Sequence, residues 1–290
     1  MLRKYSGTAQ ISIRFAILLV CLSSVWHPAA VNGQTGESID ELKARVTILL
    51  NQTKYTEAIR LLERIVAAHP EDAEGHYFLA SAVQGLIPHT KDEAVRKQLH
   101  LRARAEFDEA RNRYIEDFIT EPYDSFTVAG FTRWAQATRT PLVHPKIDIP
   151  IRVRFDAKGD LKINLDSDAL LSGKEDGSFA WISYGATRSS WHKEKFKQTF
   201  PNEGSYRHSL AEEADALRSV ITLATTDKPK NLSPSLAKLK KLNDAGLLEA
   251  YILLARSDAG IARDHPAYLR ANRDKLRRYV LDYVLKGGGN

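Results

Sequence analysis

The apolar positions in the first half of the chain recur with helical spacing. Over residues 55–68, one face of a helix would carry four apolar side chains: Ala58, Leu61, Leu62 and Ile65. Residues three and four apart share one side of a helix, so this pattern predicts an amphipathic helix. Pro70 follows and cannot continue the helix, because proline lacks a backbone N–H.

The period changes at residues 147–165, where apolar and other residues alternate. One run extends from Ile147 to Phe155 and a second from Leu161 to Leu165, with a Gly-containing turn between them. Alternation places every second side chain on one face of a strand, so this segment is predicted to form a β-hairpin. A lone hairpin is only marginally stable in water, and we therefore expect it to pack on helices.

Helical patterns resume after the hairpin. Ser178 is expected to cap a helix that reaches about residue 195, and the segment from Ser209 to Glu212 has the spacing of a capping box. Behind that box runs one apolar stripe: Leu210, Ala214, Leu217, Ile221 and Ala224. Further helices are predicted at 235–242, at 246–256 and from Pro266 towards the C-terminus. The chain is therefore predicted to be mainly α, with helical hairpins, one β-hairpin and a C-terminal helical bundle.

Residues 1–33 have the features of a secretory signal peptide. Basic residues border an apolar run from Phe15 to Val25, no acidic residue precedes Glu37, and small residues lead up to Gly33. An apolar run of eleven residues is too short to span about 30 Å of hydrocarbon as a helix. We therefore expect cleavage and export to the periplasm or the extracellular space, with no transmembrane segment left in the mature protein.

An internal repeat connects two parts of the first half of the chain. Residues 55–58 and 107–110 share the order aromatic, polar, Glu, Ala, and a proline follows twelve residues after each alanine, at Pro70 and Pro122. A small side chain is needed where paired helices cross closely. The pattern resembles the second helix of a tetratricopeptide repeat, and the run from Ala73 to Ala82 resembles the opening helix of the next repeat. The resemblance also implies a third opening helix at residues 125–138. This resemblance covers residues 39 to about 135.

The spacing of the repeat departs from that of the family. Ala58 and Ala110 are 52 residues apart, whereas the family period is about 34 residues. We therefore expect an insertion near 85–102, within a repeat domain over 34–139 that is followed by a mainly α domain over 140–290. Phe107, like Tyr55, is expected at the turn that precedes the second helix of its repeat.

The resemblance implies a binding function rather than a chemical one. Tetratricopeptide repeats hold a protein or peptide segment on the concave face of their first helices. The matching positions form the predicted groove: Lys43, Thr47, Leu50, Tyr77, Ser81 and Gln84. Tyr77 is the expected anchor, because an exposed tyrosine offers a large contact area and such anchors often dominate binding energy.

Composition and motifs argue against catalysis. The chain has 290 residues, 43% of them apolar and 27% charged, which is a globular balance of one or two domains. Its one cysteine, Cys21, lies in the signal segment, and a mature protein without cysteine favours a bacterial envelope. The histidines have no metal-ligand spacing, and His208 and His265 are interpreted as surface or capping residues. We therefore expect no catalytic, cofactor-binding or metal-binding residue.

The charge divides along the chain. Residues 34–122 hold 12 basic and 16 acidic side chains, whereas residues 123–290 hold 27 basic and 20 acidic ones. Solvated helix faces account for this division. The basic runs are short and mixed with Asp, so we expect no nucleic-acid partner.

An aromatic cluster at 179–206 supports an alternative hypothesis. It contains seven aromatic residues, and an arginine lies among them at helical spacing. An arginine between aromatic rings can stack on them and can bind a carboxylate or phosphate in bidentate fashion. The alternative is a ligand-binding or enzymatic C-terminal domain that uses Trp181, Tyr184, Arg188, Trp191 and Arg207. The simpler interpretation is that these side chains form the core of that domain.

Overall fold

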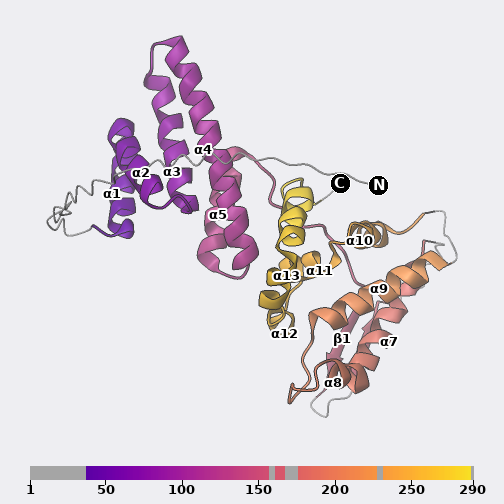
Figure 1. Cartoon of the computed structure of the whole chain (residues 1–290). Helices are drawn as coiled ribbons and strands as arrows, with labels where there is room; N and C mark the ends of the chain where they lie inside the picture. Colours follow the sequence, from indigo (N-terminus) through magenta and orange to yellow (C-terminus); the bar gives the residue numbers. More distant parts are fainter. Residues whose placement is uncertain (1–36, 157–160, 167–175, 227–230, 289–290) are drawn as a thin grey trace, which may run out of the picture. The chain divides into compact units, whose positions relative to one another are not determined.

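The computed structural model describes residues 37–156, 161–166, 176–226 and 231–288. The expected signal peptide, residues 1–33, lies outside the described residues, as does most of the turn of the predicted hairpin. Within the described ranges the protein is mainly α, with one two-stranded antiparallel sheet between two groups of helices (Figure 1). The predicted fold class is confirmed.

The first group of helices forms successive hairpins, in which each helix packs on the next. Its elements are α1 (Ile39–Asn51), α2 (Tyr55–Ala68), α3 (Ala73–Leu86), the 3-10 turn η1 (Ile87–His89), α4 (Glu93–Thr120) and α5 (Ser125–Thr138). The helices α2 and α5 have the predicted bounds. Packed hairpins of this kind are compatible with a tetratricopeptide-like array.

Local sequence signals explain where these helices begin. Three aspartates, Asp72, Asp92 and Asp124, precede α3, α4 and α5. Each accepts a hydrogen bond from the backbone N–H three residues on, at 3.2, 3.0 and 2.7 Å respectively. Such a cap satisfies one of the donors that the first turn of a helix leaves unpaired. Helices α2 and α4 end just before the prolines that were expected to stop them.

Close packing between the hairpins depends on small residues. Ala58 and Ala110 are fully buried at 0% exposure, as the repeat pattern requires. Gly85 is a further small residue of this kind, because a Cβ placed there would lie 2.3 Å from a ring carbon of Tyr55. The Tyr55 ring therefore lies directly against the backbone of α3. The helices of the first hairpins can pack this closely because the residues at these positions are small.

Residues 85–102, where an insertion was predicted, take a form that the repeat pattern did not indicate. Helix α3 ends at Leu86, and after η1 the chain enters α4, which is 28 residues long. The insertion therefore forms a turn and the first part of α4, which returns along α3 from the tip of their hairpin (Figure 1). Phe107 lies in the middle of α4 and not at a turn. That expectation was wrong because the helix is extended backwards past its motif.

The predicted β-hairpin is present and shorter than expected at its start. Strand β1 (Ile151–Phe155) pairs with β2 (Leu161–Leu165) in a register that places Ile151 opposite Leu165. Residues 147–150 are not part of β1. Helix α7 (Ile182–Ser190) packs on β1, and Gly185 allows the close approach, because a Cβ there would lie 3.0 Å from Cδ1 of Ile163. The hairpin is thus supported by a helix, as expected.

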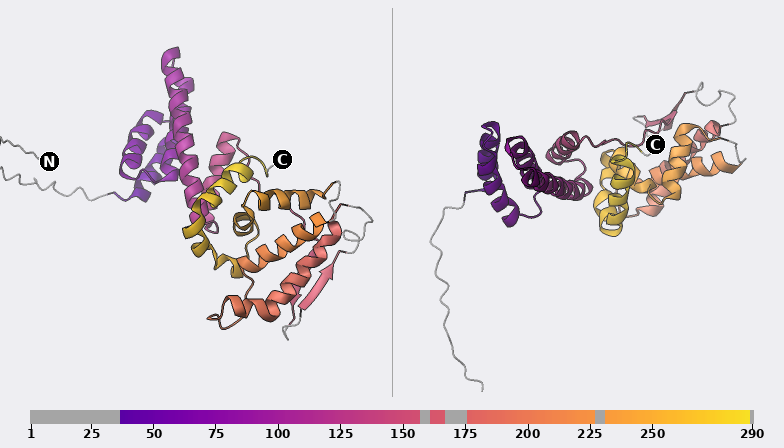
Figure 2. Two further views of the ribbon diagram at one scale, coloured as in Figure 1. Left: turned by 45° about the vertical axis from the view of Figure 1, so that its right-hand side comes forward. Right: turned by 90° about the horizontal axis from the view of Figure 1, so that it is seen from above.

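The second group of helices forms the C-terminal bundle (Figures 1 and 2). It contains η2 (Ser178–Trp181), α7, the π-helix η3 (Trp191–Lys195), α8 (Phe196–Thr199), α9 (Leu210–Thr226), α10 (Pro234–Asp244), α11 (Leu248–Ala255), α12 (Ala259–Ala262), α13 (His265–Tyr279) and the π-helix η4 (Val280–Val284). All five residues of the predicted stripe on α9 are buried. The expected helices at 235–242 and 246–256 correspond to α10 and α11.

Two predicted caps differ in detail from the structure. Ser178 is the first residue of η2 and Gly177 is its N-cap, without a side-chain cap, while the backbone N–H of Ser178 donates to Oδ1 of Asp176 at 3.0 Å. Ser209 does accept from the N–H of Glu212, at 3.2 Å. The Glu212 carboxylate, however, binds Arg188 and Tyr206 instead of completing the box. A tertiary partner has replaced the local one.

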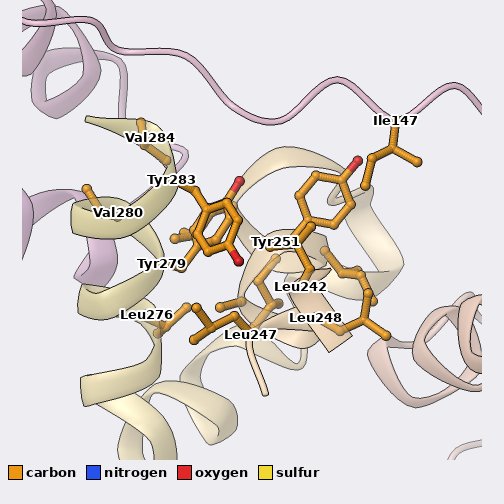
Figure 3. Close-up of a cluster of buried hydrophobic side chains, with 14 of the residues drawn as sticks. Ile147, Leu242, Leu247, Leu248, Tyr251, Leu276, Tyr279, Val280, Tyr283 and Val284 are labelled. Carbon is orange, nitrogen blue, oxygen red and sulfur yellow. The ribbon is translucent and has the colours of Figure 1, made fainter. Parts of the chain in front are cut away.

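One hydrophobic core joins the two groups of helices. It runs from Ala73 and Ala110 in the first group to Val284 near the C-terminus. In the C-terminal bundle it is built around Tyr251, Tyr279 and Tyr283, with leucine and valine side chains about them (Figure 3). Residues 39–290 form one compact unit. The predicted domain boundary between residues 139 and 140 stays a prediction. Among the described residues, no helix is both long and apolar enough to cross a membrane.

Candidate functional site

The first turns of α3 and α5 meet α1 around a cavity of about 440 Å³, here called the front cavity. Ion pairs connect the three helices across it. Lys43 of α1 lies 2.9 Å from Oδ1 of Asp72 and 3.4 Å from Oε2 of Glu74. The other Glu74 oxygen lies 3.3 Å from Arg133 of α5. These side chains fix the position of the cavity walls and give it charges of both signs.

Phe126 lies at the rim of the front cavity and is 85% exposed. It is the most exposed large apolar side chain in the part of the chain that the structure describes. Its position in the first turn of α5 is set by Asp124, which caps that helix. Sequence reasoning missed Phe126, although the predicted helix 125–138 placed it in a first turn.

The charge of the front cavity depends on pH. Asp117 of α4 lines it, and partial burial raises the pKa of its carboxyl to about 6, with the charges of Asp72 and Glu121 adding to the shift. A carboxyl with this pKa titrates close to neutral pH. The cavity therefore becomes more negative as the pH rises through about 6.

The six residues of the predicted groove do not form one exposed surface. Tyr77 is half-buried, and its ring centroid lies 5.5 Å from that of Phe78 and 6.2 Å from that of Phe107. Its expected exposure was wrong, because the extended α4 brings Phe107 against it. Leu50 packs on the core between α1, α2 and α3. As a binding set, these residues stay a prediction.

The polar members of that set have separate surroundings. Lys43 belongs to the front cavity, whereas Gln84 lines a second and larger cavity. The hydroxyls of Thr47 and Ser81 donate to the carbonyls one turn earlier, of Lys43 and Tyr77. Of the six, Lys43 is the one that lines the front cavity together with Phe126.

The second cavity is a groove of about 1230 Å³ along α4, here called the basic groove. Its walls come from the end of α3, the first part of α4, the last turn of α5 and residues 281–286. Five Lys or Arg side chains line it, against two carboxylates. The insertion in the repeat thus contributes much of its surface.

The alternative site, at the aromatic cluster, is largely internal. Arg188 is 7% exposed, and its Nε donates to Oε1 of Glu212 at 2.5 Å. Its Nη1 donates to the Tyr184 hydroxyl at 3.1 Å, and that hydroxyl donates to Oε2 of Glu213 at 2.7 Å. Trp181 is buried. Glutamates of the protein thus occupy the position that an acidic ligand of Arg188 would take.

The remaining members of the alternative site are also paired within the chain. Arg207 binds Glu203 and Asp264 and donates to the Gly260 carbonyl at 2.9 Å. The Trp191 indole N–H donates to Asp215 at 2.7 Å. None of the five residues of this alternative site lines the front cavity or the basic groove. The ligand-site hypothesis stays a prediction that these contacts do not favour.

His208 connects this network to the loop before α12. Its Nδ1 lies 2.7 Å from Asp258, and its Nε2 lies 3.2 Å from Oε2 of Glu213. Burial alone would lower the pKa of His208, but the hydrogen bond and charge of Glu213 raise that pKa above its ordinary value. Burial of Tyr184 beside Glu213 raises the pKa of its hydroxyl, so the phenol stays protonated. The network is suited to holding helices together rather than to acid–base chemistry.

The interpretation of two histidines as surface or capping residues is therefore corrected. His208 is held between two carboxylates, and its side chain is 16% exposed. His265 is buried, and its Nε2 lies 3.0 Å from the carbonyl of Ile119 at the end of α4. Both link elements that are distant in sequence, which local patterns do not reveal.

The described residues contain no group of three or more His, Cys, Asp or Glu side chains that could hold a metal ion. No family model, curated protein or solved structure matches the chain.

Proposed function

We propose that the protein is an exported, non-enzymatic interaction protein whose tetratricopeptide-like array binds a segment of a partner protein. The observation that carries this proposal is the exposure of Phe126 beside the front cavity. Exposing a large aromatic ring to water is unfavourable, and burying it on binding would contribute about 2 kcal/mol or more if it acts as an anchor. The partner would place an apolar side chain against this ring.

The charged residues around Phe126 would fix the orientation of the bound partner segment. Glu74 and Arg133 are only partly buried, so each can also bind backbone or side-chain groups of a partner. Lys43, from the predicted groove, lies on the other side of Glu74. An apolar anchor surrounded by charged groups is the usual anatomy of a specific interface. The surface around the front cavity has both, with Phe126 as the apolar anchor and Lys43, Glu74 and Arg133 as the charged groups.

Export is the second part of the proposal and rests on the sequence of residues 1–33. Basic, apolar and small residues follow one another there in the order of a cleaved signal peptide. A protein without cysteine after that segment suits a bacterial periplasm. The geometry favours binding by the array over a ligand site at 179–207, because Arg188 and Arg207 already bind carboxylates of the protein.

Photo-cross-linking tests which face binds the partner. Benzoylphenylalanine is placed at Phe126 in one variant and at Phe179 in another, and cross-linked products are analysed from an envelope fraction. Phe179 is a matched control, because it is also an exposed aromatic, at 58%, but belongs to the aromatic cluster. We expect one discrete product from position 126 and none from position 179.

Phe126→Ala should then weaken capture of that product by about 2 kcal/mol, a hot-spot value. Phe179→Ala should leave capture unchanged. Cross-linking from position 179 alone would contradict the proposal and support the ligand-site alternative.

A further inference from the structure

The basic groove exists because the insertion lengthens α4. One face of the added turns packs on α3 and α2 through Leu99 and Ala103. The neighbouring face lines the groove, opposite Trp134 in α5 and the leucines at 281 and 285. The groove thus has a helical wall that a tetratricopeptide repeat of ordinary length would lack. It does not include Phe126, so it is separate from the face proposed above.

The charges along this wall are only partly balanced within the protein. The two carboxylates of the groove are each paired, Glu93 with Arg96 and Asp108 with Arg111. In the described ranges the side chains of Lys97 and Arg104 have no hydrogen-bond or ion-pair partner. Two cations therefore remain available on the groove wall, and an acidic ligand would complement them.

An apolar residue lies between these two cations. Leu101 is 62% exposed and follows Lys97 by four residues and precedes Arg104 by three. Residues at these intervals share one face of a helix. Seven residues of helix correspond to a rise of about 10 Å. The wall therefore presents the order cation, leucine, cation over two helical turns.

We infer that the basic groove binds an acidic segment of a partner protein, in which two carboxylates about 10 Å apart flank one large apolar side chain. The carboxylates would meet Lys97 and Arg104, and the apolar side chain would cover Leu101. Nucleic acid fits this wall less well. Single strands are held by exposed aromatic rings on which bases stack, whereas Trp134 is 3% exposed and its indole N–H donates to the Phe107 carbonyl.

The inference is tested by fluorescence anisotropy with the mature full-length protein. The probe is a labelled synthetic peptide of about 16 residues, helical and alanine-based, with Glu at the two outer positions and Leu between them. A second peptide carries Lys in place of each Glu, and a single-stranded RNA of comparable length is the third probe. We expect binding of the acidic peptide alone, with a Kd that rises as salt is added.

Variants then locate the binding. Arg104→Glu and Leu101→Asp should each raise the Kd of the acidic peptide about tenfold, because both place a negative charge against it. Lys54→Glu makes the same charge change as Arg104→Glu at an exposed residue outside the groove and should leave the Kd unchanged. Circular dichroism shows that each variant is folded.

Three results would overturn the inference: no binding of the acidic peptide, equal binding of the Lys peptide, or equal effects of Arg104→Glu and Lys54→Glu. RNA binding that Arg104→Glu abolishes, without peptide binding, would assign the groove to nucleic acid instead. Because Phe126 lies outside the groove, each of these results leaves the cross-linking test of the array unaffected.

Discussion

At the scale of single residues, buried charge in the C-terminal bundle is arranged as a closed network. Glu212 and Glu213 are 0% and 2% exposed. Glu212 pairs with Arg188 and accepts from the Tyr206 hydroxyl, whereas Glu213 has three basic side chains within ion-pair distance. Arg188 binds both, and Nε of Arg256 lies 3.5 Å from Glu213. Burying charges in this way costs desolvation energy that only complete pairing offsets. Removing Arg188 would take away the ion pair of the buried Glu212.

His208 makes the stability of this network dependent on pH. Its folded pKa is raised, so the protonated ring contributes stability that is fully present below its ordinary pKa and is lost as pH rises through the folded pKa. His208→Gln should therefore lower the Tm by about 3–6 °C at pH 6 and by much less at pH 9. Differential scanning calorimetry at the two pH values measures the difference.

His69→Gln is the control for that experiment, because His69 is an exposed residue that also lies near a carboxylate, Glu71. It should leave the Tm close to that of the wild type at both pH values. A His208→Gln effect that is the same at pH 6 and pH 9 would contradict a charged His208.

At the level of helices, local signals mark where an element begins and ends, and packing on a neighbour stabilises its full length. Proline stops α2 and α4 at the expected places, and aspartates start α3, α4 and α5. The extension of α4 backwards to Glu93 follows from its packing on α3. It moves Phe107 from a turn to the middle of a helix. That shift in turn covers Tyr77.

The small residues at the helix crossings give a prediction at this scale. Ala110→Arg and Ala58→Arg should each destabilise the protein by about 3 kcal/mol or more, because a large charged side chain would be forced into a filled, apolar crossing. Chemical denaturation followed by circular dichroism measures the free energy of unfolding.

Exposed alanines in the same helices provide matched controls. Ala105→Arg in α4 and Ala67→Arg in α2 make the same change at exposed positions and should be nearly neutral. Equal stability of Ala110→Arg and Ala105→Arg would mean that Ala110 does not lie at a helix crossing.

Across the whole molecule, polar contacts as well as the shared hydrophobic core connect the C-terminal bundle to the first group of helices. Tyr123, just before α5, donates to the Leu253 carbonyl at 2.8 Å. Glu116 of α4 binds both Arg273 and Arg277 of α13. A short array needs neighbours to cover its ends. The bundle provides such a cover for α4.

The final prediction concerns the mature protein as a whole. Export should remove residues 1–33, because a basic start, an apolar run and small residues precede Gln34. Intact-mass measurement of protein from an extracytoplasmic fraction is expected to give a chain that begins at Gln34. A mass that retains Met1 and Cys21 would contradict cleavage.

Local sequence patterns were sufficient to predict several elements of this protein. Helix periodicity, alternation and proline stops act between residues a few positions apart, so they placed α2 and the β-hairpin. The repeat resemblance placed α5 and identified Ala58 and Ala110 as small residues at helix crossings. These features depend on backbone geometry and side-chain size. Both are properties of a short stretch of chain.

Which side chains are available to a partner depends on the fold as a whole. His265 binds a carbonyl 146 residues away, and Arg188 meets glutamates 24 and 25 residues on. Tyr77 is half-buried against Phe107 of α4, whereas Phe126, in an ordinary first turn, is left exposed. Exposure and ion pairing depend on what the rest of the chain brings to a residue, and no local pattern contains that information.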